Sequence, residues 1–342
     1  MEAKRKIEIL STISLTDEQT KQIQAVDERI KLDVFKAKEV NKISDEIWRR
    51  TEILFMSVGS LPPVEKVPNL RWLHSSLAGV ETILESPLFH QPGLLISNSS
   101  GANISQMGEY VIMMLLALGH KLPQMAHAQR EKRWVEDKHV SLIPKELRGS
   151  TVGIVGYGSI GREVARQLFA YGATVLASKR DVMHPEDAGY TPGGLGDPLG
   201  NYFHRLYPNE GLKGMLKDCD FVVLTLPRTK ETECLFDKEM FEAMKPGAHF
   251  INVSRGHLVD EGALVEVLNS GHLAGAALDV FTEEPLPADS PLWTQPNLII
   301  TPHISAYSTN MMNQVVDLFV ENLKRYLSNE PLYNLVSLEQ GY

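Results

Sequence analysis

The stretch TVGIVGYGSIG, residues 151–161, decides the fold of this chain of 342 residues. Thr151–Val155 is a short apolar run that is typical of a buried strand. Glycines follow at positions 156, 158 and 161, and apolar residues then recur at helical spacing from Ile160 to Phe169. A strand, a glycine turn and a helix in this order predict a dinucleotide-binding unit.

Each glycine of the turn has its own physical reason. Gly156 permits the tight turn, Gly158 lets the backbone approach a pyrophosphate, and Gly161 lets the helix pack closely on the strand. Ser159 and Ile160 begin the helix, whose free N–H groups and positive dipole end favour phosphates. The alternative is a structural turn in an α/β sheet that binds no phosphate, and the residues alone leave it open.

The composition argues against several kinds of protein. A length of 342 residues favours two domains over one, and a hydrophobic content of 43% is ample for a sizeable core. The net charge is −9, with basic residues mixed among acidic ones, so nucleic-acid binding has little support. The most apolar run, Val111–Gly119, is too short to span a bilayer, so we expect no membrane partner.

Two further features concern the compartment. The N-terminus MEAKRKIEIL lacks the long apolar core of a signal peptide. Cys219 and Cys234 have neither metal-ligand nor disulfide-framework spacing. We therefore expect reduced, buried thiols in a cytoplasmic protein, and no metal site.

The first hundred residues read as a small α/β domain. Thr16 with Gln19 resembles a capping box and predicts a helix that runs toward Leu32. Short strands separated by helical patterns imply a parallel sheet. The expected strands are Ile7–Leu10, Leu32–Phe35, Glu52–Val58, Leu70–His74 and Leu94–Ser97.

Strands and helices alternate again after the glycine turn. The expected strands are Ala173–Ala177, Phe221–Leu226, Phe250–Val253, Ala276–Val280 and Leu298–Ile300, with helices at Lys238–Met244 and Gly262–Ser270. Residues 181–210, rich in Gly, Pro, Tyr and His, predict a long loop instead. Such a loop is a functional lid or is disordered, and the sequence leaves both open.

Two long helices set the domain organisation. Asn103–Lys121 is apolar on almost all sides, which suits a connector between domains or a subunit interface, and a second helical segment runs to about Arg133. A last helix, Ser305–Leu327, is expected to return the chain to the first domain. The prediction is an α/β protein with a Rossmann-type doubly wound sheet over 104–304. A smaller flavodoxin-like domain, discontinuous in sequence, takes 1–103 and 305–342.

Three polar residues follow predicted strands of the second half, namely Arg255, Glu284 and His303. Ligands of doubly wound sheets bind beyond the carboxyl ends of the strands. A guanidinium can hold an anionic substrate, an imidazole can pass a proton, and a carboxylate beside it fixes its tautomer. Singly, Arg255 could form a surface ion pair, Glu284 could be solvated with Glu283 as its rival, and His303 could fill space; their joint placement favours a redox site.

The chain resembles the D-isomer-specific 2-hydroxyacid dehydrogenase family, which includes glyoxylate/hydroxypyruvate reductases and phosphoglycerate dehydrogenase. The resemblance runs from about Leu70 to Ser305 and rests on separate motifs in the order of the family. They are SSLAGVE at 75–81, the glycine turn at 156–161, LPRTKET at 226–232, NVSRG at 252–256, ALDVFTEEPLP at 277–287 and TPHIS at 301–305. The first seventy residues resemble the family only in their pattern.

The resemblance implies a role for each catalytic candidate. Arg255 would bind the carboxylate and the carbonyl of the substrate, and His303 would donate the proton to the carbonyl. Glu284 would hold His303 and favour its imidazolium form. The backbone N–H groups around Leu77, Ala78 and Gly79 would bind the substrate carboxylate.

The resemblance also implies contacts that line the cleft and hold the cofactor. Asn103 and Ser254 would line the cleft, the former on the substrate side and the latter on the cofactor side. Asp279 would meet the nicotinamide carboxamide. Leu226 and Pro227 would contact the cofactor.

The second strand of the nucleotide half bears on the choice of cofactor. An acidic residue about 20 residues past the glycines normally binds the ribose 2′-hydroxyl of NAD. That position holds Lys179, with Ser178 before it and Arg180 after it, and Asp181 comes too late. Because two cations would attract a 2′-phosphate, we predict NADP(H) over NAD(H). The alternative is that Lys179 and Arg180 are solvated charges at the strand end.

The leading hypothesis is NADPH-dependent reduction of a small 2-oxo acid, such as glyoxylate or hydroxypyruvate, to the D-2-hydroxy acid. One alternative is an NAD-dependent, phosphoglycerate-like dehydrogenase, against which Lys179 argues. Another is a non-catalytic, nucleotide-sensing protein that resembles the corepressors of this fold. The resemblance further implies a homodimer, for which Met107–Leu118 is the apolar surface that we assign.

Overall fold

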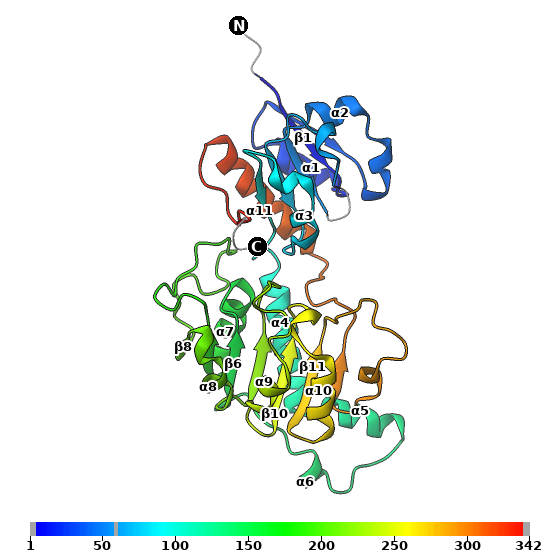
Figure 1. Cartoon of the computed structure of the whole chain (residues 1–342), viewed down its shortest axis with the longest axis vertical. Helices are drawn as coiled ribbons and strands as arrows, with labels where there is room; N and C mark the ends of the chain where they lie inside the picture. Colours follow the sequence, from blue (N-terminus) through cyan, green and yellow to red (C-terminus); the bar gives the residue numbers. More distant parts are fainter. Residues whose placement is uncertain (1–4, 58–60, 338–342) are drawn as a thin grey trace. The chain divides into compact units, whose positions relative to one another are not determined.

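Two separate parallel sheets organise the chain in the computed structural model, which describes residues 5–57 and 61–337 (Figure 1). The smaller unit takes Met1–Asn103, Ala188–Tyr190 and Ser308–Tyr342, and the larger takes Ile104–Asp187 and Thr191–Tyr307. The predicted α/β fold with a discontinuous smaller unit is confirmed. Three residues of the expected loop, 188–190, group with the smaller unit, where Tyr190 packs against Tyr333 at 5.9 Å between ring centroids.

The smaller unit is built on a five-stranded sheet in the order β2-β1-β3-β4-β5. All pairings are parallel, and this is the strand order of the flavodoxin-like fold. Its strands are β1 (Ile7–Ser11), β2 (Ile30–Val34), β3 (Ile53–Met56), β4 (Trp72–Ser75) and β5 (Leu95–Ser97). Its helices are α1 (Asp17–Gln24), α2 (Asp45–Arg50), α3 (Glu81–Leu84) and α11 (Met311–Leu327).

The first helix begins where predicted and ends earlier. Thr16 caps α1 with both hydrogen bonds of the capping box, which involve Gln19. The helix stops at Gln24 because a turn follows and Leu32 already lies in β2. The expectation that this helix reaches toward Leu32 is therefore wrong. Val58, the expected end of the third strand, lies outside the described residues.

Helix α11 completes the core of the smaller unit. Its Phe319 stacks on Phe55 of β3 with centroids 4.2 Å apart and on Trp72 of β4 at 5.2 Å. All three side chains are fully buried. The last helix thus packs on the sheet of the smaller unit. It begins at Met311 and not at Ser305 as expected.

The larger unit has seven parallel strands in the order β12-β11-β10-β9-β6-β7-β8. Counted from β6, this is the Rossmann order with one further strand at the edge. The strands are β6 (Thr151–Val155), β7 (Thr174–Ser178), β8 (Arg205–Tyr207), β9 (Phe221–Leu224), β10 (Ala248–Asn252), β11 (Leu273–Leu278) and β12 (Leu298–Ile300). Strand β8 falls inside the expected loop 181–210, and its three residues are too few to show a pattern.

Helices cover both faces of this sheet (Figure 1). Helices α4 and α7 pack on one face, and α8, α9 and α10 pack on the other. The helices of this unit are α4 (Ile104–Gly119), α5 (Leu122–Arg130), α6 (Lys138–Ser141), α7 (Ser159–Tyr171), α8 (Leu212–Leu216), α9 (Lys238–Glu242) and α10 (Glu261–Asn269). Among the described residues, the helices lack the combination of length and apolar character that a membrane span requires.

Helix α4 is buried within its own unit. Most apolar side chains of Met107–Leu118 join the core that α7 and the sheet form, which explains a helix that is apolar almost all round. Met113 is the exception at 51% exposure. The assignment of the whole stretch to a subunit interface is therefore wrong, because the same chain already covers most of it.

The two cysteines have different surroundings. Cys219 is buried in the core of the larger unit, where a Cβ added at Gly153 would come within 2.5 Å of its Sγ. Cys234 is exposed, with a left-handed φ of 49°. Both thiols are free, and the expectation of two buried thiols is wrong for Cys234, which lies in a turn.

Candidate active site

The glycine turn joins β6 to α7 and carries three glycines with different surroundings. Gly156 has φ +107°, a conformation that side chains rarely adopt. A Cβ at Gly161 would lie 2.4 Å from the carbonyl oxygen of Gly156, so this glycine is required for packing. A Cβ at Gly158 would meet no atom within 4 Å. The protein leaves open space above Gly158, at the N-terminus of a 13-residue helix, which fits a bound pyrophosphate.

Neighbouring strands hold the turn in place. The hydroxyl of Thr225 donates to the carbonyl oxygen of Gly156 at 2.7 Å. The N–H of Gly156 donates to the hydroxyl of Ser178 at 3.3 Å. A Cβ at Gly156 would also lie 3.0 Å from Leu226 Cδ2, so Leu226 and the following Pro227 lie beside the turn.

Glu284 and His303 are in direct contact. Glu284 Oε2 lies 2.7 Å from His303 Nδ1, and its other oxygen accepts the N–H of Phe281 at 2.9 Å. Because an ionised carboxylate only accepts, the hydrogen bond places a proton on Nδ1. Nε2 is then the nitrogen that can exchange a proton with a ligand. Both side chains are partly exposed, at 33% and 47% respectively.

A buried aspartate fixes the turn that carries His303. The carboxylate of Asp279 accepts from the hydroxyl of Thr301 at 2.6 Å and from the N–H groups of Ile304 and Ser305, each at 2.9 Å. The N–H of His303 donates to the carbonyl oxygen of Asp279 at 2.8 Å. These contacts hold His303 at φ +51°, a left-handed conformation that is uncommon for a side-chain residue. Asp279 is thus a support of the turn, and its contact with nicotinamide stays a prediction.

Arg255 follows the neighbouring strand β10. The side-chain amide of Asn252 donates to its carbonyl oxygen at 3.0 Å, and Asn252 Oδ1 accepts the hydroxyl of Ser254 at 2.7 Å. A Cβ at Gly256 would overlap the backbone of Phe281, three residues before Glu284. The loop of Arg255 therefore packs directly on the turn that presents Glu284. The three candidates end adjacent strands at one edge of the sheet.

The loop after β4 in the smaller unit carries the other predicted contacts. The N–H of Leu77 donates to the hydroxyl of Ser75 at 3.2 Å, and the carbonyl oxygen of Leu77 accepts from Ser99 N. Among the hydrogen bonds of residues 5–57 and 61–337, none uses the N–H of Ala78 or Gly79 as a donor. Within the same residues, Asn103 Oδ1 is buried without a partner.

The sequence profile of the family described as D-isomer specific 2-hydroxyacid dehydrogenase, NAD binding domain, matches residues 112–305. The chain belongs to this family. A protein of Haemophilus influenzae that is named as a 2-hydroxyacid dehydrogenase is 32% identical over 271 residues, which are 77% of this chain and 80% of the relative. The D-3-phosphoglycerate dehydrogenase of Archaeoglobus fulgidus is 32% identical over 275 residues. Those residues are 80% of this chain and 49% of that enzyme, so the chain spans about half its length.

Solved structures agree with this assignment. The D-isomer specific 2-hydroxyacid dehydrogenase of Xanthobacter autotrophicus Py2, solved with NADPH and MES, superposes with a TM-score of 0.79 at 28% identity over 98% of this chain and all of that one. The NADPH-dependent glyoxylate/hydroxypyruvate reductase of Sinorhizobium meliloti, solved with NADP and sulfate, gives 0.74 at 25% identity over 98% and 99%. The chain is therefore an oxidoreductase of the NAD(P)-dependent D-2-hydroxyacid dehydrogenases.

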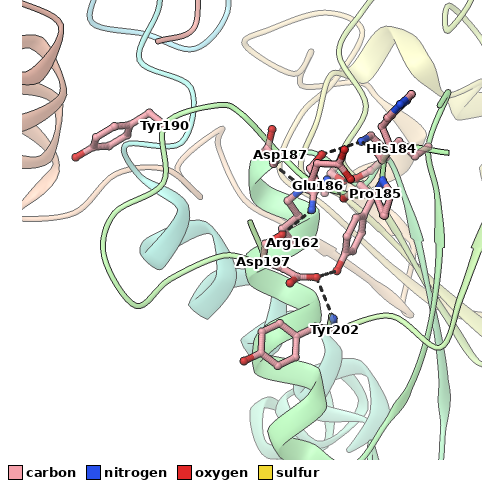
Figure 2. Close-up of polar contacts among 12 residues, drawn as sticks. Arg162, His184, Pro185, Glu186, Asp187, Tyr190, Asp197 and Tyr202 are labelled. Atoms are coloured by element: carbon pink, nitrogen blue, oxygen red, sulfur yellow. Dashed lines mark hydrogen bonds and ion pairs between the residues drawn. The ribbon is translucent and has the colours of Figure 1, made fainter. Parts of the chain in front are cut away.

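In this 2-hydroxyacid dehydrogenase, buried charges hold the insertion between β7 and β8 (Figure 2). Arg162, in the first turn of α7, is 1% exposed. Its guanidinium donates to the carbonyl oxygens of Asp197 and Pro185, each at 2.6 Å, and lies over the ring of Tyr157 at 4.7 Å. Its Nε is 3.5 Å from Asp187. The insertion is thus attached to the helix that follows the glycine turn.

Asp197 is the second centre of this attachment (Figure 2). Its buried carboxylate accepts from the hydroxyl of Tyr157 at 2.6 Å and from the N–H groups of Asn201 and Tyr202 at 2.7 and 2.9 Å. Burial raises the pKa of the Tyr157 phenol, and the neighbouring Asp197 raises it further. Sequence reasoning missed Arg162 and Asp197. The available signal was an arginine within the first turn of a helix that packs against the sheet.

Lys179 contacts the same insertion. Its ammonium donates to the carbonyl oxygens of His184 and Glu186. Burial and the charge of Arg162 lower the pKa of Lys179. Within residues 5–57 and 61–337, these two carbonyls are its hydrogen-bond acceptors, while an ammonium has three donors. The hydroxyl of Ser178 already accepts from the glycine turn, and Arg180 is exposed. A phosphate contact of these residues stays a prediction.

Proposed function

We propose that this enzyme reduces a small 2-oxo acid to the D-2-hydroxy acid, with NADPH as the preferred cofactor. The observation that carries the proposal is the 2.7 Å contact of Glu284 with His303, at the carboxyl edge of the sheet that carries the glycine turn. A relative of similar fold is named as an NADPH-dependent glyoxylate/hydroxypyruvate reductase, which supports a small 2-oxo acid as substrate.

The side chains divide the work. Glu284 accepts the Nδ1 proton of His303 and thereby orients the ring and leaves Nε2 for the substrate. His303 donates its Nε2 proton to the carbonyl oxygen of the substrate. Arg255 binds the carboxylate of the substrate through its guanidinium. The N–H groups of Ala78 and Gly79 are donors for a carboxylate as well. The cofactor, when bound, supplies the hydride.

A panel of 2-oxo acids tests the proposal directly. The purified protein should oxidise NADPH with glyoxylate or hydroxypyruvate, and the product should be the D enantiomer where the product is chiral. Substrate-dependent activity should be absent with 2-oxo compounds that lack a carboxylate, because Arg255 then has no anionic partner. If none of the acids supports NADPH or NADH oxidation, the proposed function is wrong.

The cofactor preference is tested by a ratio. We expect kcat/KM with NADPH to exceed that with NADH, and Arg180→Ala to lower only the NADPH value by about tenfold, as one charge-assisted contact is worth about 1.4 kcal/mol or more. Lys179→Met should act in the same direction and also loosen the insertion, since Lys179 holds two of its carbonyls. Lys238→Ala, which breaks an exposed ion pair between Lys238 of α9 and Glu266 of α10, is the charge-matched control. A wild-type preference for NADH would refute the assignment.

We also propose a homodimer, on a surface smaller than the sequence predicts. Met113 is 51% exposed, and Leu122 and Met125 of α5 are exposed beside it. They line a shallow cleft of about 640 Å³ together with Ile112 and Leu116. Met113→Lys should shift the protein from dimer to monomer in light scattering, whereas Met183→Lys, at an 81% exposed methionine of the insertion, should not. A monomeric wild type would contradict the proposal.

We also propose a cytoplasmic location, with which the two free thiols accord.

A further inference from the structure

A chain of hydrogen bonds runs under the loop after β4. Trp72 Nε1 donates to the hydroxyl of Ser97 at 2.8 Å, and that hydroxyl lies 2.7 Å from His74 Nδ1. On the other side of the ring, His74 Nε2 lies 3.2 Å from the hydroxyl of Ser99. The hydroxyl of Ser99 donates to the carbonyl oxygen of Ser75 at 2.8 Å. All five residues are buried, with exposures from 0 to 4%.

The direction of every bond in this chain is fixed by its ends. A carbonyl oxygen only accepts, so the single hydroxyl proton of Ser99 goes to Ser75. His74 Nε2 must then carry the proton that it shares with Ser99. A neutral ring carries one proton, so with Nε2 protonated Nδ1 is the acceptor and receives the hydroxyl proton of Ser97. The indole N–H of Trp72 donates to the oxygen of the same hydroxyl. The chain therefore has one consistent arrangement, with the Nε2–H tautomer of His74.

Burial keeps this arrangement intact. His74 is fully buried, which lowers its pKa to about 3, so the ring stays neutral. Phe55, Trp72 and Phe319 surround it, with ring centroids 5.5 to 5.8 Å away. The ring cannot flip without leaving buried donors and acceptors unpaired, which is costly.

The chain ends at the loop that offers free N–H groups. Ser75 begins this loop, and its hydroxyl accepts the N–H of Leu77. Ser99 holds the loop twice, because its hydroxyl binds the carbonyl of Ser75 and its N–H donates to the carbonyl oxygen of Leu77 at 3.2 Å. The Ser99 N–H thus orients the peptide unit that precedes Ala78, and its hydroxyl, which contacts His74, holds the start of the loop that leads on to Gly79.

We propose that His74 and Ser99 are positioning residues for substrate binding: the hydrogen-bonded chain Trp72–Ser97–His74–Ser99 orients the loop 75–79 so that the N–H groups of Ala78 and Gly79 bind the substrate carboxylate. The inference rests on the proposed function for the identity of that ligand. The loop has no cationic side chain of its own between Ser75 and Gly79. Its affinity for an anion therefore depends on how its amides point.

Steady-state kinetics on Ser99→Ala tests the proposal. We expect KM for the 2-oxo acid to rise about threefold to tenfold, the effect of one neutral hydrogen bond, with kcat and the KM for NADPH within about twofold of wild type. His74→Phe should raise KM at least as much, and His74→Gln, which keeps one acceptor and one donor, should recover part of the loss. Thr51→Val is the control. It removes the hydrogen bond from the buried Thr51 hydroxyl to the carbonyl oxygen of Ile47, which lies before the start of β3 and away from the loop after β4. It should cost stability and leave KM unchanged.

Two measurements separate this proposal from the proposed function. Nitrogen-15 NMR of the imidazole should show a protonated Nε2 and an unprotonated Nδ1 in His74, unchanged from pH 5 to 9. Amide exchange of Leu77 should quicken in Ser99→Ala and not in Thr51→Val. Both hold even if no 2-oxo acid is reduced, in which case only the ligand assignment fails. An Nδ1–H tautomer, or an unchanged KM in an active Ser99→Ala, would overturn the positioning role.

Discussion

His303→Asn is expected to lower kcat by about 10²- to 10⁴-fold, the usual loss when a positioned proton donor is removed. The dissociation constant of NADPH should stay within about twofold, because the glycine turn and the strand end beyond β7 are untouched. Asn is chosen because position 303 has φ +51°, and asparagine tolerates this left-handed conformation better than alanine. The turn held by Asp279 is then preserved while the imidazole is lost. Steady-state NADPH oxidation gives kcat, and pre-steady-state oxidation at varied NADPH concentration gives the dissociation constant of NADPH.

Two further variants make the result specific. Glu284→Gln places an amide N–H opposite His303 Nδ1, which favours the other tautomer and withdraws the negative charge. We expect kcat to fall here as well, by less than in His303→Asn. His127→Asn removes a histidine that pairs with Glu131 at 3.0 Å on α5, and should leave kcat unchanged. Turnover at the wild-type rate in His303→Asn would remove this residue from the role of proton donor.

The sequence was sufficient to predict the sheet edge at which Glu284 and His303 lie. In a parallel sheet, residues that end successive strands meet at one edge, so the segments after β10, β11 and β12 could be grouped without coordinates. The contact of Glu284 with His303 agrees with that grouping, whereas the choice of Glu284 over Glu283 came from the resemblance to the family. Apolar runs likewise located most of the strands.

Contacts that depend on irregular backbone could not be predicted. Arg162 of α7 binds the carbonyl oxygen of Asp197, which lies in a loop without hydrophobic periodicity. Nothing in the local sequence indicates which carbonyl oxygens a buried guanidinium will bind. The hydrogen-bonded chain through His74 joins β4 to the end of β5, and requires the register of those strands to be known. Apolar character alone also does not tell a subunit interface from a core. For this reason the sequence assigned Met107–Leu118 of α4 to an interface, although most of it is buried in its own unit.

Gly158→Asp is expected to raise the dissociation constant of NADPH by at least about a hundredfold without unfolding the protein. The residue is the N-cap of α7, a position where aspartate is among the preferred residues, so the stability of the apoprotein should be kept or increased. No atom of the described residues lies within 4 Å of a Cβ built at Gly158, so an aspartate side chain would extend into the open space in which we expect the phosphates of NADPH. Repulsion of unit charges near 4 Å is about 4 kcal/mol at the effective dielectric of a protein surface, which exceeds the roughly 2.7 kcal/mol of a hundredfold change.

Gly161→Ala is the matched comparison, because it separates packing from ligand binding. Its Cβ would lie 2.4 Å from the carbonyl oxygen of Gly156 and 2.8 Å from Ile154 Cγ2, so the melting temperature should fall before any cofactor is added. Gly158→Asp should show the opposite pattern, with an unchanged or higher melting temperature and no upward shift when NADPH is added. A Gly158→Asp protein that still binds NADPH tightly would mean that the pyrophosphate does not lie over this helix, and the cofactor site would have to be sought elsewhere on the sheet.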